Sequence, residues 1–285
     1  MKARREHVHR RISQSLACFA VDGDCFDAPY HFHPEIEIAL IREGSGTRII
    51  GDAMASFQGR DLCLIGENLP HLYCGQQPEG VRARAEVIQF SREEWGGLFD
   101  TLPEMRRIAE LLDRSARALR FPDALIPEVT ELMQRTRETA DASRIVAFLE
   151  LLNLLSREME NACSLVSPGY HAEIDHSQSE RIDQACRFII EHASEDLSHP
   201  EVAARAGLSP PAFSRLFHKA TGMTYTRFLN EVRLGHAARL LLETQLPVAQ
   251  IAFETGFNNL SNFNRRFRAH YGRAPSQYRK TLVSN

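Results

Sequence analysis

The sequence contains no run of 18 or more apolar residues, so no segment is expected to cross a membrane as a helix. Its six cysteines form no Cys-x-x-Cys pair, which is typical of reduced thiols and not of a disulfide framework. The basic stretch MKARREHVHRRISQ at the start is not followed by the apolar segment of a secretory signal. These absences predict a cytoplasmic protein without membrane contacts.

Acidic residues are missing from one end of the chain, where none follows Glu254. Residues 176–285 hold 14 Lys and Arg against 9 Asp and Glu, whereas the other residues hold 20 against 28. A basic end on an acidic body is typical of a segment that binds a polyanion, although a solvated surface would give the same balance. With 285 residues, 43% of them hydrophobic, the chain is long enough for two domains.

The pattern of apolar residues changes twice along the chain. Residues 15–95 predict β-structure, because short runs such as EIEIALI and RAEVIQF are separated by Gly, Asp and Pro. Residues of about 98–160 predict helices, and IVAFLELLNLLSREME has its apolar side chains at helical spacing. That wide stripe packs on its own domain or on a second subunit, and we favour a homodimer. Residues 161–178 have no period and predict a linker.

The last hundred residues contain an internal repeat of about 49–50 residues. The two copies are VAARAGLSPPAFSRLFHKATG and IAFETGFNNLSNFNRRFRAHYG. In each copy a short helix ends at a glycine, Gly207 or Gly256, which permits a left-handed turn. A second helix follows, and we expect Ser209 and Asn258 to be its caps.

The second helix of each copy has two different faces. Phe213, Phe217, Phe263 and Phe267 recur at helical spacing and predict the buried face. The outer faces carry polar and basic side chains: Ser214, Arg215, His218 and Lys219 in the first copy, and Ser261, Asn262, Asn264, Arg265 and Arg268 in the second. Arg and Asn can read base edges, while Ser and Lys can hold phosphates.

This layout predicts two helix-turn-helix units, at about 198–220 and 247–271. Residues 228–244 predict one long helix that joins them and fixes their spacing. Two helical hairpins with solvated outer faces are the alternative interpretation.

Segment 178–280 resembles the DNA-binding domain of the AraC/XylS family of bacterial transcription regulators, through GLS…FSRLFHKATG, RL…A…LL and IAFETGFNNLSNFNRRFRAHYGRAPSQYR. The resemblance implies binding to double-stranded promoter DNA, commonly with activation beside RNA polymerase. Its base-facing positions fall on Pro211, Ser214, Arg215 and His218 in the first unit, and on Ser261, Asn262, Asn264, Arg265 and Arg268 in the second. Because Pro211 has no side-chain donor, the second unit is better equipped to read bases.

The stretch HFHPEIEIALIREG fits the pattern H-x-H-x3-E-x6-G through His31, His33, Glu37 and Gly44. It resembles the first motif of the cupin-like sensor domain that many members of the same family carry. The stretch GRDLCLIGENLPH resembles the second motif, with His71 as its histidine, although Leu64 replaces the usual proline. This resemblance implies a β-barrel.

The four residues His31, His33, Glu37 and His71 offer three imidazoles and a carboxylate, a set suited to Fe, Mn, Ni or Zn. One interpretation is a divalent metal site, with or without catalysis. A second is a metal-free pocket in which these residues and Glu35 bind a small-molecule effector. A third is a structural role in the core.

The predicted fold class is α+β multidomain. A cupin-like domain with a barrel (about 15–95) and helices (about 98–160) spans residues 1–160. A linker (161–178) leads to an all-α DNA-binding domain (179–285). We expect a sequence-specific transcription regulator and not an enzyme, and an activator, with a repressor as the alternative. Its expected partners are promoter DNA, RNA polymerase, a second copy and an effector such as a sugar or another catabolite. A metal-dependent cupin enzyme or metal sensor fused to a DNA-binding domain is the competing prediction.

Overall fold

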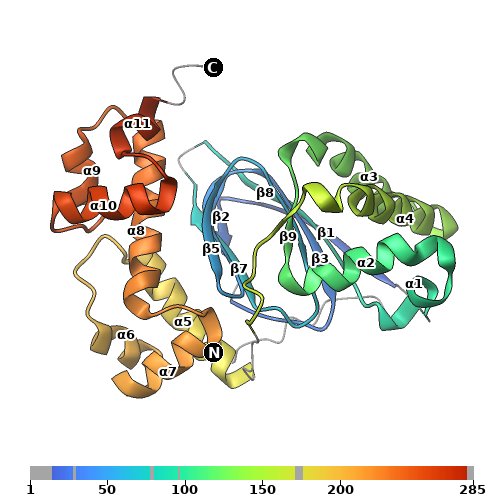
Figure 1. Cartoon of the computed structure of the whole chain (residues 1–285), viewed down its shortest axis with the longest axis horizontal. Helices are drawn as coiled ribbons and strands as arrows, with labels where there is room; N and C mark the ends of the chain where they lie inside the picture. The colour runs from blue at the N-terminus through green and yellow to red at the C-terminus, as the bar shows by residue number, and fades with distance from the viewer. Residues whose placement is uncertain (1–14, 28–29, 78–79, 96, 171–175, 281–285) are drawn as a thin grey trace. The chain divides into compact units, whose positions relative to one another are not determined.

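The computed structural model of the chain describes residues 15–27, 30–77, 80–95, 97–170 and 176–280. The chain divides into two compact units, residues 1–176 (unit 1) and residues 177–285 (unit 2), whose helices and strands Figure 1 draws. Each unit has its own hydrophobic core. No helix of the described residues is both long enough and apolar enough to span a bilayer.

Unit 1 contains two antiparallel sheets. The larger sheet has the strand order β1-β8-β3-β6-β9-β10 and the smaller has β2-β7-β4-β5. The strands that fall in the range predicted as β are β1 Leu16–Gly23, β2 Cys25–Asp27, β3 Ile36–Glu43, β4 Ser45–Ile50, β5 Ala53–Gln58, β6 Asp61–Ile65, β7 His71–Gln76 and β8 Ala83–Phe90.

Strand β3 is buried on both of its faces. Ile36, Ile38 and Leu40 pack in the core that the sheet shares with the helices, whereas Ala39 and Ile41 pack in the core formed with residues of the smaller sheet. Successive side chains of a strand point to opposite faces, so Glu37 lies on the side of Ala39. A strand that is buried on both faces is nearly continuously apolar, as IEIALI is.

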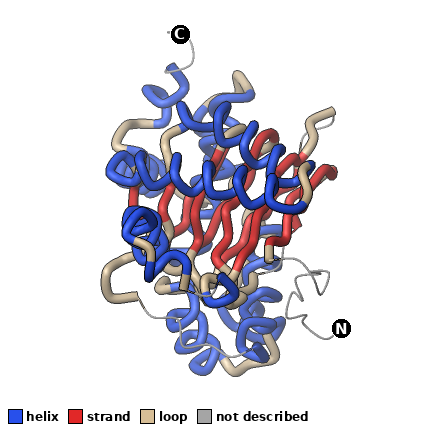
Figure 2. The backbone as a smooth tube through the Cα atoms, turned by 90° about the vertical axis from the view of Figure 1, so that its right-hand side faces the viewer, coloured by secondary structure: helices blue, strands red, loops and turns tan. Residues whose placement is uncertain are grey.

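Helices cover one face of the larger sheet, and Figure 2 shows the longer ones lying across its strands. They are α1 Leu98–Thr101, α2 Arg106–Arg114, α3 Ile126–Glu138 and α4 Asp141–Arg157, with short 3-10 turns at Glu93–Trp95, Pro103–Met105, Ser115–Arg117, Asp123–Leu125 and Met159–Asn161. The apolar stripe of α4 packs on this unit, with Phe148, Leu152 and Leu155 fully buried. Val146 is the one large apolar residue of α4 counted as exposed, at 52%. The stripe therefore gives no support to the predicted homodimer.

Two short strands occur where the sequence indicated helix or linker. Strand β9 (Leu119–Arg120) pairs with β6, and β10 (Cys163–Ser164) pairs with β9. Val166 is also buried in the core between the sheets. The first part of the predicted linker 161–178 thus belongs to unit 1, because its backbone extends the sheet and one apolar side chain is buried. Residues 171–175 lie outside the described residues.

The secondary-structure elements in the described part of unit 2 are all helices. Its helices are α5 His176–Glu191, α6 His199–Arg205, α7 Pro210–Thr221, α8 Tyr225–Glu243, α9 Val248–Glu254, α10 Leu260–Tyr271 and α11 Pro275–Lys280. The pairs α6–α7 and α9–α10 have the same layout, and α8, the predicted long helix, lies between them in the chain (Figure 1). The four predicted core phenylalanines are fully buried: Phe213, Phe217, Phe263 and Phe267.

The two turn glycines differ in what surrounds them. Both have a left-handed backbone, with φ of +65° at Gly207 and +88° at Gly256. A Cβ on Gly207 would meet nothing within 4 Å, whereas a Cβ on Gly256 would lie 2.7 Å from the carbonyl oxygen of Ala193 and 2.7 Å from Nε of Arg233. The Arg233 guanidinium donates to the carbonyl oxygens of Ala193 at 2.7 Å and Glu195 at 2.8 Å. The α9–α10 turn therefore packs against the loop that follows α5.

Replacing these glycines with alanine separates the cost of a left-handed backbone from the cost of the close contacts at Gly256. Gly207→Ala should lower the free energy of unfolding by about 1–2 kcal/mol, the cost of a left-handed non-glycine residue. Gly256→Ala should lower it further, because the methyl group would also overlap a backbone carbonyl. Urea unfolding of both full-length variants, followed by circular dichroism, measures the difference. Equal losses would show that the Ala193 contact adds nothing.

Candidate DNA-binding face and buried histidine cluster

The outer face of α7 carries the first predicted set of DNA-contacting residues. Pro210 occupies the first turn and Gly222 ends the helix in a left-handed conformation. Pro211, Ser214 and His218 are exposed, opposite the buried Phe213 and Phe217. Oγ of Ser214 lies 2.9 Å from Nε2 of His199 on α6. The hydroxyl of Ser214 is therefore oriented by the preceding helix of its own pair.

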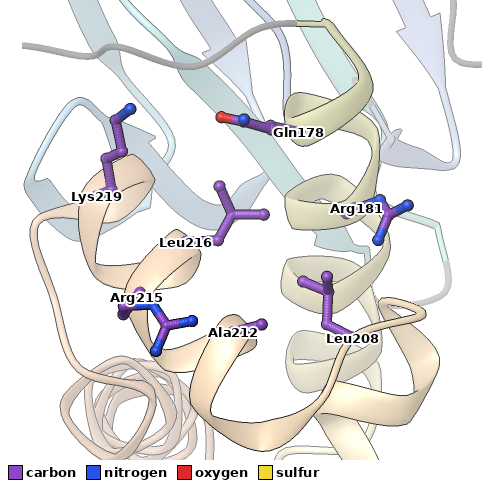
Figure 3. A pocket seen from close by; sticks show the side chains of 7 residues that line it. All are labelled: Gln178, Arg181, Leu208, Ala212, Arg215, Leu216 and Lys219. Atoms are coloured by element: carbon purple, nitrogen blue, oxygen red, sulfur yellow. The ribbon is translucent and has the colours of Figure 1, made fainter.

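Arg215 lies on the flank of α7 that faces α5. It lines a groove together with Arg181 and Lys219 around an apolar floor (Figure 3). The remaining lining residues are Gln178, Leu208, Ala212 and Leu216. Nη1 of Arg181 also donates to the carbonyl oxygen of Gly207 at 3.2 Å. The sequence analysis missed Arg181, because α5 lies outside the repeat and no spacing within the repeat points to it.

Helix α10 begins one residue later than the sequence suggested. Its N-cap is Asn259, whose side chain accepts a hydrogen bond from the backbone N–H of Asn262 at 2.9 Å. The prediction that Asn258 caps this helix was wrong, because the extra residue of the second copy falls in the turn and moves the cap. In the first copy Ser209 is the N-cap as predicted, although its side chain makes no capping hydrogen bond.

The outer face of α10 carries the second predicted set. Ser261, Asn264, Arg265 and Arg268 are exposed. Asn262 is half-buried, and its Oδ1 accepts hydrogen bonds from Nη2 of Arg265 at 3.0 Å and Nε of Arg266 at 3.1 Å. In this arrangement Asn262 orients Arg265.

Both outer faces lie in stretches of sequence without acidic residues. No Asp or Glu occurs between Glu201 and Glu231 or after Glu254. The positive charge of α7 and α10 is thus not offset by acidic residues of their own segments, which suits contact with phosphates. Helix α10 also contacts α8 through Nδ1 of His270, which lies 2.6 Å from Oε2 of Glu231.

In unit 1 the structure brings together the four residues of the predicted metal set, here called the His–Glu cluster: His31, His33, Glu37 and His71. They are 9%, 3%, 5% and 2% exposed, and one potential ligand atom from each lies within 4.8 Å of all the others. His31 and His71 form a β-bridge, with N–H to carbonyl distances of 3.1 and 2.9 Å. The cluster therefore joins β3, β7 and the segment that precedes β3.

Hydrogen bonds orient the side chains of the cluster. Nδ1 of His33 lies 3.1 Å from the carbonyl oxygen of Glu35, and Nδ1 of His71 lies 2.9 Å from that of Leu69. Nε2 of His33 lies 3.3 Å from Oε2 of Glu37, which also accepts a bond of 2.8 Å from Nε2 of Gln89. Burial raises the pKa of Glu37, but the charges and hydrogen bonds of His71 and His33 outweigh burial, so this pKa lies well below its usual range.

One predicted residue lies outside the cluster, and one residue that was not predicted contacts it. The carboxylate of Glu35 is not part of the cluster, although its Oε2 lies 3.5 Å from Nδ1 of His33. Gln89, which the sequence analysis missed, contacts the cluster because it is the register partner of Glu37 across β3 and β8. No motif marks Gln89, and it could have been found only from the strand register.

A second buried polar group lies between the sheets around Asp61. This carboxylate accepts bonds from Nη1 of Arg48 at 2.6 Å, Nε of Arg120 at 2.9 Å and the hydroxyl of Tyr73 at 3.4 Å. Burial raises the pKa of the neighbouring Cys63 thiol to about 12. The thiol is therefore protonated at neutral pH. The polar group around Asp61 serves to pair this carboxylate with the charges of Arg48 and Arg120.

Comparisons with known proteins found a helix-turn-helix family model and relatives that are named transcriptional activators. A family model described as a helix-turn-helix domain matches residues 202–281. The chain is 27% identical over 263 residues to the HTH-type transcriptional activator RhaS of Klebsiella pneumoniae, covering 88% of this chain and 87% of the relative. The corresponding activator of Enterobacter sp. is 25% identical over the same shares.

Solved structures similar to the chain include a DNA complex. The DNA-binding domain of AdpA in complex with a target DNA is 28% identical, with a TM-score of 0.35, covering 36% of this chain and 94% of that one. ToxT of Vibrio cholerae is 15% identical, with a TM-score of 0.38, covering 95% of this chain and 99% of that one.

The cap of α10 provides a test with a matched control. Asn259→Ala should lower the free energy of unfolding by about 0.5–2 kcal/mol, because the N–H of Asn262 loses its acceptor. Asn258→Ala, at an adjacent exposed position, should change it by less than about 0.5 kcal/mol. Chemical unfolding of the two variants in parallel gives both values, and a larger loss for Asn258→Ala would contradict the observed cap.

Proposed function

Because the chain belongs to the AraC/XylS family of transcription regulators, we propose that it reads promoter DNA through α7 and α10 and responds to a ligand bound in unit 1. The chain is a DNA-binding transcription regulator and not an enzyme. In this proposal α6–α7 and α9–α10 are the two helix-turn-helix units, and the sheets of unit 1 form the cupin-like barrel.

The outer face of α10 is the observation that carries the proposal. Asn264, Arg265 and Arg268 project from a helix whose other face is fixed by buried phenylalanines. These side chains are suited to base edges, whereas Ser214, Arg215 and His218 on α7 are suited to a mixture of base and phosphate contacts. Helix α8 has 19 residues and so rises about 28 Å. This length is compatible with two recognition helices in successive major grooves, about 34 Å apart.

The response to a ligand is the second part of the proposal. The His–Glu cluster and Glu35 offer polar groups to a small-molecule effector such as a sugar, and the four residues of the cluster also fit a divalent metal ion. A ligand can alter DNA affinity only through different affinities for two states of the regulator. Activation is the favoured mode because the similar curated proteins are named activators, with repression as the alternative. Contact with RNA polymerase and assembly as a homodimer are further parts of the proposal, and they rest on the family resemblance alone.

Removal of Arg265 tests the DNA contact. A site selected from random duplexes by the full-length protein would serve as the probe, with binding followed by fluorescence anisotropy. Arg265→Ala should weaken specific binding by about 1–3 kcal/mol, or roughly 5- to 150-fold, because a base or phosphate contact is lost. Arg106→Ala removes the same charge from the exposed surface of unit 1 and should leave affinity unchanged. Equal affinities of the two variants would remove α10 from the proposed interface.

The salt dependence of DNA binding tests the role of the outer faces of α7 and α10, whose segments contain no acidic residues. If α7 and α10 together neutralise about 6–10 phosphates, affinity should fall by about 10³–10⁵ between 50 and 200 mM salt, because bound counterions are released. The same anisotropy titration over this range gives the slope. An affinity that is independent of salt would contradict DNA binding through these faces.

A further inference from the structure

We propose that the groove between α5 and α7 binds the sugar-phosphate backbone of DNA beside the major groove that α7 enters, with Arg181 of α5 as a phosphate ligand. Such a contact depends on the proposed function, because it extends the DNA contact of α7 to a helix outside both helix-turn-helix pairs. The residues that line this α5–α7 groove are Gln178, Arg181, Leu208, Ala212, Arg215, Leu216 and Lys219. Together they offer cations to the phosphates and apolar atoms to the sugars of one DNA strand.

The lining of the groove is cationic. Arg181, Arg215 and Lys219 are exposed, and among the described residues that line the groove none is acidic. Asp183 is close in sequence on α5, but side chains two residues apart on a helix do not face each other. Its carboxylate instead accepts a hydrogen bond of 3.0 Å from Nε of Arg187. Three cations around one groove favour a polyanion as its occupant.

The cations lie on both sides of an apolar floor. Figure 3 shows Arg181 on α5, across the groove from Arg215 and Lys219 on α7. Leu216 and Ala212, which are half-buried, lie between them. Protein contacts to DNA include the sugars as well as the phosphates. A strand laid along the groove would therefore place its sugars on the floor and its phosphates between the cations.

The groove is continuous with the outer face of α7. Ala212, Arg215, Leu216 and Lys219 are spaced by three or four residues, so they lie on one flank of the helix, and Arg215 also belongs to the predicted base-facing set. A helix about 10–12 Å wide fills a major groove of about 12 Å, so each flank lies next to one of the two DNA backbones. The flank of α7 that faces α5 is therefore beside a backbone whenever α7 reads bases.

A hydrogen bond fixes the guanidinium of Arg181 at the edge of the groove. Its Nη1 donates at 3.2 Å to the carbonyl oxygen of Gly207, the glycine of the turn between α6 and α7. A guanidinium has five N–H donors, so this bond leaves others for phosphate oxygens. Contacts to phosphates set the register of a protein on the duplex but carry no sequence information. Arg181 therefore positions α7 and does not select bases.

Arg181→Ala tests the contact in the full-length protein, with the selected duplex and a scrambled duplex as probes for fluorescence anisotropy. Because one phosphate contact releases about 0.9 counterion, affinity should fall about 15-fold at about 50 mM salt but only about 5-fold at about 150 mM. The slope of log affinity against log salt should become shallower by about 0.9. Both duplexes should be affected equally, since a phosphate contact is independent of sequence.

Three further variants separate the phosphate contact from a structural role of Arg181. Arg181→Gln keeps a donor for the Gly207 carbonyl but not the charge, and should lose affinity as Arg181→Ala does. Arg181→Lys keeps the charge and should recover most of the affinity and the slope. Arg187→Ala removes an arginine of the same helix that does not line the groove, and should leave both unchanged. Circular dichroism checks that each variant is folded. Equal affinities and slopes of Arg181→Gln and Arg187→Ala would overturn the contact and leave the proposed function standing.

Ethylation of single phosphates then locates the contact on the DNA. Ethylation removes the charge of one phosphate at a time, and it weakens wild-type binding where that phosphate is contacted. One such position, beside the bases at which Arg215→Ala relaxes selectivity, should no longer interfere in Arg181→Ala. An unchanged interference pattern would show that Arg181 contacts no phosphate.

Two other outcomes would count against the contact for different reasons. If Arg181→Ala bound DNA normally and lost only transcription in vitro with RNA polymerase, the groove would be a protein contact, and the proposed DNA contact would be overturned. If the wild type bound no duplex at low salt, the proposed function would fail, and the contact at Arg181 with it.

Discussion

A carboxylate buried between two sheets must have partners, and this constraint organises the interior of unit 1. Glu37 and Asp61 are 5% and 1% exposed and both lie on the inward face of the larger sheet. Leaving either charge unpaired there would cost several kcal/mol. The partners come from different strands, so each carboxylate helps to fix how the two sheets pair and pack.

The two carboxylates are satisfied by different chemistry, and this gives the interior two distinct regions. Asp61 faces the permanent charges of Arg48 and Arg120, which leaves it fully paired. Glu37 faces imidazoles and an amide, which carry no permanent charge. The same need for partners thus produces a structural ion pair at Asp61 and a candidate ligand site at Glu37.

The sequence predicted those features that depend on local period and spacing. Strands β1 to β8, the four buried phenylalanines and the turn glycines follow from patterns within short segments. The grouping of His31, His33, Glu37 and His71 followed instead from the resemblance to the two cupin motifs. Gln89, Arg181 and Arg48 could not be predicted, since their contacts depend on strand register or on a helix outside the repeat. Asn259 replaced Asn258 as a cap because one inserted residue shifts a helix start. Val166 belongs to unit 1 although its segment has no hydrophobic period, because its burial depends on tertiary packing.

The repeat in unit 2 is similar in layout but unequal in its surroundings, and this inequality bears on how it could read DNA. A Cβ on Gly207 would meet no atom within 4 Å, whereas Gly256 packs against Ala193 and Arg233. Arg233, on α8, donates to carbonyl oxygens of the loop after α5 and lies close to Gly256, so the second pair packs against the segment that leads into the first pair. If α7 and α10 are the reading helices, as proposed, this packing would limit independent changes in their spacing. A DNA site with the wrong separation between its halves should then weaken the contacts of one helix, and spacing would contribute to specificity.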